Sequence, residues 1–461
     1  MGIQEFQSDE EHTEYLAKFQ INPNRAMFTI ILSILVDVFG YSMVIPLLPT
    51  LVTVEFGATY FMYGVLISSN AVAILVFSPI WGRLSDKYGR KRILMISQAG
   101  TAVAFLTIAF SNSVYMILFA RILDGIFSGQ FPVVRAYISD VTTPQTRASQ
   151  MSKIMVGYTA GMVIGPLISS LLANFGWWVP MIVAYFITIF SAILTIGLLV
   201  ESMPKERIAH LKNRIKQKRE ISGVEDSIWT RELGIRFIEV FLLSLMSMIF
   251  GSSFAVVLLD RYSADYNIIG SIMSVSAFIV MIYGLFFMRR LIRKVGEKKM
   301  LFVSLSCYIL VFLIYPYLNE LWMIYVLMIP YGFGAASIGP LLSTNVTKAT
   351  DPDKQGRVSG WSGNLSAISQ TVSPIISNGF LQLGGFFIGF VFINSYQLIG
   401  FTNVFLGIIL VIITYKDVKM HPSLYSYERI RKKRIAIQKR KKKAAKQKRK
   451  AEKKGEIPME G

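Results

Sequence analysis

The chain alternates between long apolar stretches and shorter polar turns. A helix needs about 20 mostly apolar residues to cross about 30 Å of hydrocarbon. Twelve such stretches occupy residues 26–48, 60–81, 92–111, 114–136, 151–174, 177–200, 233–259, 268–288, 300–317, 321–342, 358–381 and 391–415. Because lipid offers backbone groups no water, each stretch is predicted to be helical. The pattern therefore predicts an all-α, polytopic membrane protein with about twelve spans.

The polar stretch 201–232 separates the sixth apolar stretch from the seventh and divides the chain into two six-helix bundles. The predicted parts are an N-terminal segment, a first bundle, a linker, a second bundle and a tail, at residues 1–25, 26–200, 201–232, 233–415 and 416–461.

The two predicted bundles resemble each other. The sequence of residues 81–92 is weakly repeated in residues 288–299, where Gly296 matches Gly89. Many transporters are built from such duplicated halves, with a central site that opens alternately to either side. The repeat predicts two pseudo-symmetric bundles.

Lys and Arg follow the second, fourth, sixth, eighth and tenth stretches, and Arg261 is the exception on the other side. By the positive-inside rule the basic side is cytoplasmic, which predicts a multi-pass protein of the cell membrane with both termini in the cytoplasm.

Composition supports a membrane protein. Hydrophobic residues make up 53% and charged residues 16%, whereas soluble domains carry about a quarter charged residues. Cys307 is the one cysteine, so no intrachain disulfide forms. The histidines His12, His210 and His421 fall outside the apolar stretches. Proton chemistry within the membrane would therefore rest mostly on carboxylates.

The segment 429–454 is rich in Lys and Arg and accounts for most of the net charge of +20. One interpretation is attraction to anionic lipid head groups, worth about 1 kcal/mol per basic residue. The other is a largely disordered, solvated tail. Nucleic-acid binding is not expected, because no fold surrounds the segment to read bases.

The turn at residues 82–91, Gly-Arg-Leu-Ser-Asp-Lys-Tyr-Gly-Arg-Lys, has the chemistry of a gate. Gly82 and Gly89 allow close approach or sharp turning, and Asp86 can pair with a neighbouring Arg or face a helix N-terminus. Arg90 is a further candidate residue of this gating loop. The turn resembles the signature loop of the major facilitator superfamily. That resemblance implies a latch against the eleventh span, which begins near Val358. The alternative is that the charges only set topology.

Asp37 lies near the middle of the first span, where an acidic side chain costs about 3 kcal/mol. The surrounding segment 35–49 resembles the opening helix of twelve-span drug:proton antiporters, especially the tetracycline-efflux group. The resemblance implies that Asp37 binds a proton or a cationic substrate.

Arg121 and Asp124 are three residues apart in the fourth span and share one helix face. The sequence 121–125 is similar to the family's Arg-x-x-Gln-Gly motif, with Asp124 in place of the amide. The pair is either a reversible proton site or a static ion pair. The sequence leaves open whether Asp37 or Asp124 is the main proton carrier.

The fifth span places Gly157, Gly161, Gly165 and Pro166 at a spacing that favours close helix contact. In the family, a similar Gly- and Pro-containing motif accompanies exporters. Ordinary small-residue packing is the alternative.

Glu239, in the seventh span, is expected either to assist proton movement or to reach the interface. The aromatic residues Tyr41, Tyr158, Tyr331 and Trp361 are candidates to line a cavity and stack on flat or cationic compounds. Packing or interfacial anchoring is the other interpretation.

The resemblance implies a proton-coupled exporter of small organic, drug-like compounds that works by alternating access, with a monomer expected. No enzyme, cofactor or metal site is predicted, since neither a phosphate-binding Gly-rich loop nor a His or Cys cluster is found. The alternatives are a proton-coupled importer of a sugar, organic acid or peptide on the same fold, and a non-transporting membrane scaffold whose basic tail recruits a partner.

Overall fold

The computed structural model describes residues 16–18, 21–128, 131–203, 230–350, 355–388 and 390–422. Most of the predicted linker and basic tail, and residues 1–15 of the N-terminal segment, lie outside the described residues. Attraction of the tail to lipid therefore stays a prediction.

Residues 21–203 form the first half. Its helices are α2 (Pro23–Val44), α3 (Leu48–Thr50), the π-helical η1 (Leu51–Glu55), α4 (Tyr60–Tyr88), α5 (Arg90–Ala109), α6 (Val114–Phe127), α7 (Phe131–Val141), α8 (Pro144–Ala173) and α9 (Val179–Leu198). α2 begins after Asn22, whose side-chain oxygen accepts hydrogen bonds from the N–H groups of Asn24 and Arg25. α4 ends before Gly89, whose φ of +99° does not continue a helix.

Residues 230–422 form the second half. Its helices are α11 (Arg231–Tyr262), α12 (Tyr266–Ile282), the π-helical η2 (Tyr283–Phe287), α13 (Met288–Val295), α14 (Glu297–Ile314), the 3-10 turn η3 (Tyr315–Tyr317), α15 (Leu321–Lys348), α16 (Gln355–Leu383) and α17 (Ser395–Met420). Gly296, with a φ of +85°, separates α13 from α14 as Gly89 separates α4 from α5. The internal repeat thus recurs as the same backbone turn.

Eleven helical segments within the described ranges are long and apolar enough to cross a membrane. α16, which contains the eleventh predicted stretch, is not among them, although it has 29 residues. Its serines are used between helices: Ser369 Oγ donates to Phe241 O and Ser373 Oγ to Leu245 O of α11, both over 3.4 Å. Small polar residues of this kind let membrane helices pack closely. The predicted all-α polytopic fold is confirmed.

Two predicted stretches differ in detail from the structure. The stretch 114–136 lies within one candidate membrane span, Val114–Val141, but it contains two helices, since α6 ends at Phe127 and α7 begins at Phe131. Pro132, at the start of α7, has no N–H to donate to the preceding turn. The stretch 391–415 begins with a strand, because β1 (Gly385–Ile388) and β2 (Val391–Asn394) pair as an antiparallel hairpin. Aromatic and β-branched residues favour such strands, and the Asn394 side chain then caps α17.

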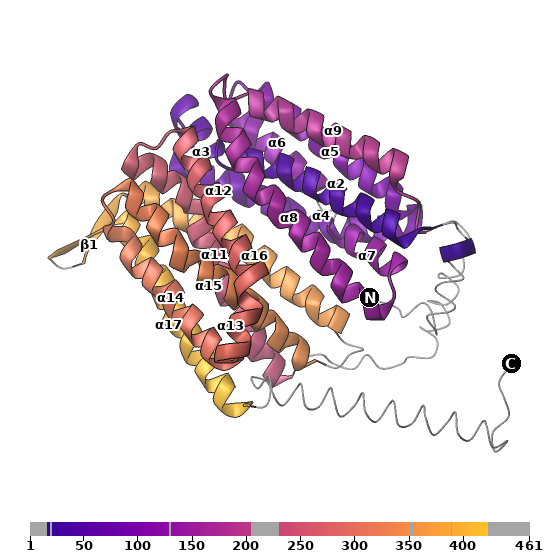
Figure 1. The fold of residues 1–461 in the computed structure, drawn as a ribbon. Coiled ribbons are helices and arrows are strands. Elements are labelled where there is room, and N and C mark those ends of the chain that lie inside the picture. Colours follow the sequence, from indigo (N-terminus) through magenta and orange to yellow (C-terminus); the bar gives the residue numbers. More distant parts are fainter. Residues whose placement is uncertain are drawn as a thin grey trace, which may run out of the picture.

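The two halves lie side by side (Figure 1). In the first half, α2 packs against α8 and α9, and α4 against α6. In the second, α11 packs against α16 and α17, and α14 against α15 and α17. The halves meet along two helix pairs, α4 with α16 and α8 with α12. Helices from both halves therefore share one central interface.

Successive long helices alternate in direction, which gives the bundle two ends. We call one the basic end: it holds the turns at Gly89 and Gly296, the start of α2 and the end of α17. The other, which we call the opposite end, holds the start of α4, the end of α11 and the β hairpin (Figure 1).

Candidate functional site

Polar side chains of α2, α5 and α9 meet inside the first half. The Gln98 Nε2 atom lies 2.7 Å from Ser33 Oγ, 2.9 Å from Ser191 Oγ and 3.1 Å from Asp37 Oδ2. Gln98 is 2% exposed, whereas Asp37 is only partly buried. An amide donor thus holds a carboxylate on a residue that is only partly buried, although its Oδ1 atom is enclosed. Such a group can take up a proton or bind a cationic compound.

The Arg121–Asp124 pair is formed inside the first half. Arg121 Nη1 donates to Asp124 Oδ2 over 2.8 Å, and the two side chains are 2% and 0% exposed. Asn70 Nδ2 of α4 donates to the same oxygen over 3.0 Å, and Ser128 Oγ donates to Asp124 Oδ1 over 2.7 Å. Charge pairing with these hydrogen bonds compensates the burial of both ions.

Gly125 makes this arrangement possible, because a Cβ atom there would overlap the backbone oxygen of Asn70. The close approach of α6 to α4 brings the Asn70 amide within reach of Asp124 and of the Arg121 backbone oxygen, to which it also donates over 3.0 Å.

Tyr41 lies beside Arg121 and is on the same helix as Asp37. Its ring centroid lies 5.9 Å from the Arg121 guanidinium carbon, and it follows Asp37 by four residues on the same face of α2. Tyr158 of α8 packs edge-to-face against Phe131, with the ring centroids 6.0 Å apart. We call Ser33, Asp37, Tyr41, Gln98, Arg121 and Asp124 the first-half polar site.

The other candidate residues belong to the second half. Tyr331 of α15 stacks on Tyr308 at a centroid distance of 5.5 Å, within an aromatic cluster that also contains Phe250. Glu239 of α11 is 1% exposed. Trp361, on α16, is 41% exposed. The described contacts of Tyr331 are therefore packing contacts within one half.

The glycines of α8 lie against α2. A Cβ atom on Gly161 would lie 3.0 Å from Leu35 O, and one on Gly165 would overlap Ser42 Oγ. Gly157 faces Ile31 in the same way, at 3.3 Å. The spacing therefore serves close helix packing, as small-residue motifs do in membranes.

The end of α8 contacts the second half. A Cβ atom on Gly270 of α12 would lie 2.6 Å from Pro166 O and 2.5 Å from Ser170 Cβ. α8 thus packs against α2 on one side and α12 on the other, so a movement of α8 would change packing contacts in both halves.

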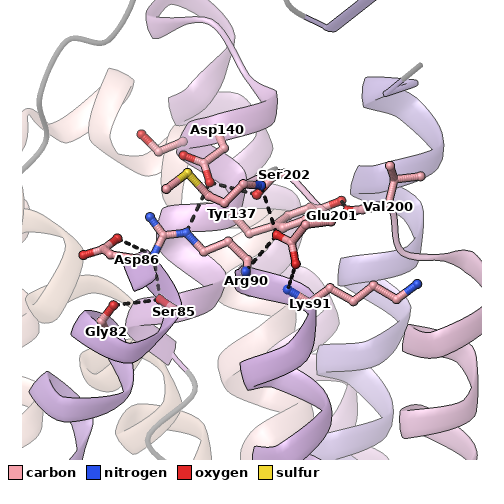
Figure 2. A network of polar contacts seen from close by, with 12 residues as sticks. Gly82, Ser85, Asp86, Arg90, Lys91, Tyr137, Asp140, Val200, Glu201 and Ser202 are labelled. Carbon is pink, nitrogen blue, oxygen red and sulfur yellow. Dashed lines mark hydrogen bonds and ion pairs between the residues drawn. The ribbon is translucent and has the colours of Figure 1, made fainter. Parts of the chain in front are cut away.

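The loop with Gly82, Asp86, Gly89 and Arg90 forms a charged network at the basic end (Figure 2). Arg90 Nη1 lies 2.6 Å from Asp86 Oδ1, and Arg90 Nε lies 3.3 Å from Asp140 Oδ2 of α7. Asp140 also accepts from Ser202 Oγ over 2.8 Å. The guanidinium is thus held between two carboxylates of different helices.

Glu201 closes the other side of this network (Figure 2). Its carboxylate accepts hydrogen bonds from Arg90 N over 2.8 Å and from Lys91 N over 3.1 Å. These are the first N–H groups of α5, where a negative charge is stabilising. Glycine is favoured at position 89, because its φ is +99° and a Cβ atom there would displace the Glu201 carboxylate.

Sequence reasoning missed Asp140, Glu201 and Ser202. One signal was present: Glu201 is an acidic residue directly after the sixth apolar stretch, on the side where basic residues dominate. Its partner could not be read from the sequence, because it lies 111 residues earlier.

Hydrogen bonds join the two halves at the opposite end. Tyr60 OH of α4 donates to Asp260 Oδ1 of α11 over 2.5 Å. Tyr396 OH of α17 donates to Asp260 Oδ2 over 2.6 Å, within the second half. Asn267 Nδ2 donates to Asn174 Oδ1 over 2.9 Å. This end is therefore held closed in the structure.

Comparison with known proteins agrees with this architecture. The chain is 28% identical over 357 residues to the tetracycline resistance protein, class H, of Pasteurella multocida, covering 77% of this chain and 88% of that protein. It is 27% identical over 288 residues to multidrug resistance protein 2 of Bacillus subtilis, covering 62% and 71%.

A solved structure shares the fold. A bacterial homologue of the human lysosomal transporter Spinster superposes with a TM-score of 0.67 at 14% identity, covering 87% of this chain and 97% of that one. The profile of the Major Facilitator Superfamily matches residues 30–374 and, in a second match, 236–448. With twelve predicted helices in two halves, the signature loop and this match, the chain belongs to the major facilitator superfamily.

Proposed function

We propose that this chain exports small organic, drug-like compounds across the cell membrane in exchange for protons, with its basic end in the cytoplasm. The observation that supports this most is the first-half polar site, which contains a partly buried carboxylate residue, Asp37, and a buried ion pair, Arg121–Asp124. The names of its relatives, which are tetracycline and multidrug resistance proteins, favour export of such compounds.

The mechanism is alternating access, in which the halves rock about the α4–α16 and α8–α12 contacts. With the site open to the cytoplasm, ionised Asp37 binds the substrate. After reorientation, a proton from outside displaces the substrate and resets the carrier. Moving one proton through about 150 mV supplies roughly 3.4 kcal/mol. That energy sustains a gradient of about 300-fold for an uncharged substrate.

The test is efflux of tetracycline and of a cationic dye from proteoliposomes under an imposed proton gradient. Wild type is expected to move at least one compound, and Asp37→Asn is expected to lose the gradient dependence, because an amide cannot exchange a proton. Glu320→Gln is the control, since Glu320 is an exposed carboxylate before α15 and should leave transport unchanged.

Equal gradient-driven transport by wild type and Asp37→Asn would show that Asp37 is not the coupling group. Accumulation of solute along the proton gradient, instead of efflux, would favour the importer. No movement of either compound would reject these two substrates and weaken the proposal of drug export.

A separate prediction concerns the hydrogen bonds that hold the opposite end closed. Tyr60→Phe removes the phenol that bridges α4 and Asp260; a hydrogen bond to a charged group contributes about 1.5–3 kcal/mol. This end should therefore open more often, by about 10- to 150-fold. The measurement is the labelling rate of Asn378→Cys, a buried position facing Gly64 of α4, in a Cys307→Ser background.

Tyr396→Phe is the matched control, because it removes a similar hydrogen bond to Asp260 within one half. It should leave the labelling rate unchanged. Equal acceleration by both variants would mean that the bond between the halves does not hold this end closed.

A further inference from the structure

A second buried cluster of ionisable groups lies between α11 and α17 at the basic end. Arg236 Nη2 lies 3.2 Å from Asp417 Oδ1, and both side chains are 0% exposed. Glu239 follows Arg236 by three residues, on the same face of α11, and is 1% exposed. We call Arg236, Glu239 and Asp417 the α11–α17 triad. All three come from the second half, so the triad is distinct from the first-half polar site.

Glu239 has no ion pair among the described residues, whereas Arg236 and Asp417 pair with each other. Arg236 Nη1 also donates to Glu232 O over 2.7 Å. Glu239 Oε1 is buried and has no hydrogen-bond partner among the described residues, and Thr414 of α17 is a polar neighbour of the carboxyl group. A buried carboxylate oxygen that lacks a donor is costly when the group is ionised.

The charge count of the triad is not balanced. With every group ionised, two carboxylates face one guanidinium and leave one excess negative charge in a buried site. Such a charge must be paired or neutralised. One proton restores neutrality and leaves the Arg236–Asp417 pair intact.

Within the part of the chain that the structure describes, no further charge lies close enough to Glu239 to take the place of that proton. Arg236 and Asp417 are the charged groups found to act on Glu239. The surrounding helices at this end carry other charged residues. Glu232 and His421 lie 3.8 Å apart, and Lys348 and Glu297 lie 2.5 Å apart. The others are Arg357, at the start of α16, and the exposed Lys416 and Lys419 of α17.

We propose that the α11–α17 triad is a proton-binding site of the second half, with the proton on Glu239. Loss of that proton leaves two carboxylates against one guanidinium and weakens the contact of α17 with α11 at the basic end. The inference concerns proton binding alone and holds whether or not the chain is an antiporter.

The test is infrared spectroscopy of the full chain in lipid nanodiscs at neutral pH, with no transported compound. The difference between wild type and Glu239→Gln should show the loss of one carboxylic-acid carbonyl band, which shifts in D2O. Glutamine has the shape of the protonated acid, so the fold should be kept. Glu232→Gln, at a carboxylate whose side chain is 55% exposed, is the matched control and should instead lose carboxylate bands.

A second variant tests the charge count. In Asp417→Asn, Glu239 becomes the one carboxylate available to balance Arg236, so the carboxylic-acid band should vanish from this variant too. This comparison also serves if Glu239→Gln does not fold. Loss of carboxylate bands in Glu239→Gln, or persistence of the acid band in Asp417→Asn, would overturn the proposal.

Discussion

Arg121→Gln is expected to destabilise the protein by about 3–5 kcal/mol, the usual cost of leaving one partner of a buried ion pair uncompensated. Asp124 is 0% exposed, and Arg121 supplies its counter-charge at 2.8 Å. Loss of that charge strands a carboxylate between α4 and α6. The measurement is the midpoint of thermal unfolding of the purified protein, with the monodisperse fraction on size exclusion.

The double variant Arg121→Gln with Asp124→Asn separates charge from packing. It carries no charge at positions 121 and 124, and the amide at 124 can still bond to Asn70 and Ser128, which contact the carboxylate in the wild type. Most of the stability should return. A double variant as unstable as the single one would show that lost packing, and not stranded charge, is the cause.

The same double variant separates the two roles of the pair. If its transport keeps the dependence on the proton gradient, the pair is a static structural element and Asp37 carries the proton. If the dependence is lost while the fold is kept, Asp124 takes part in coupling.

Gly89→Ala is expected to cost about 2–4 kcal/mol in total. A non-glycine residue at a φ of +99° is strained by about 1–3 kcal/mol. The added Cβ would also displace the Glu201 carboxylate from the first N–H groups of α5, and loss of such a cap costs about 1 kcal/mol. The measurement is again the midpoint of thermal unfolding.

Gly296→Ala is the matched control within the same chain. Gly296 occupies the equivalent turn of the second half, with a φ of +85°, but nothing lies within 4 Å of its would-be Cβ. It should show the backbone strain alone and thus a smaller loss. Equal losses at the two glycines would argue that Glu201 contributes no stability to the turn.

The sequence predicted the helices well because a membrane constrains each span locally. About 20 apolar residues are needed wherever a helix crosses lipid, and all twelve stretches read on that basis contain helix. The differences in detail have local causes as well. Pro132 lies at the start of α7, the second helix of the fourth stretch, and a run of aromatic and β-branched residues before Asn394 pairs as strands. α16 shows that a helix of such a bundle need not be strongly apolar, because its serines face α11 and bond to it.

Contacts between residues close in the chain were also accessible to sequence reasoning. Arg121 and Asp124 share a helix face at a spacing of three, and Asp86 and Arg90 at a spacing of four. Both pairs follow from helix geometry alone.

Contacts between distant residues were decided by the tertiary structure. Gln98 reaches Asp37 across 61 residues, and Glu201 reaches the start of α5 across 111. Arg236 pairs with Asp417 of α17, which lies 181 residues later in the chain. Such partners depend on which helices pack together and how they are rotated, and hydrophobicity and spacing do not encode this. The sequence by itself therefore determined the spans, the duplicated halves and the candidate carboxylates, and the tertiary structure alone decided which groups surround each carboxylate.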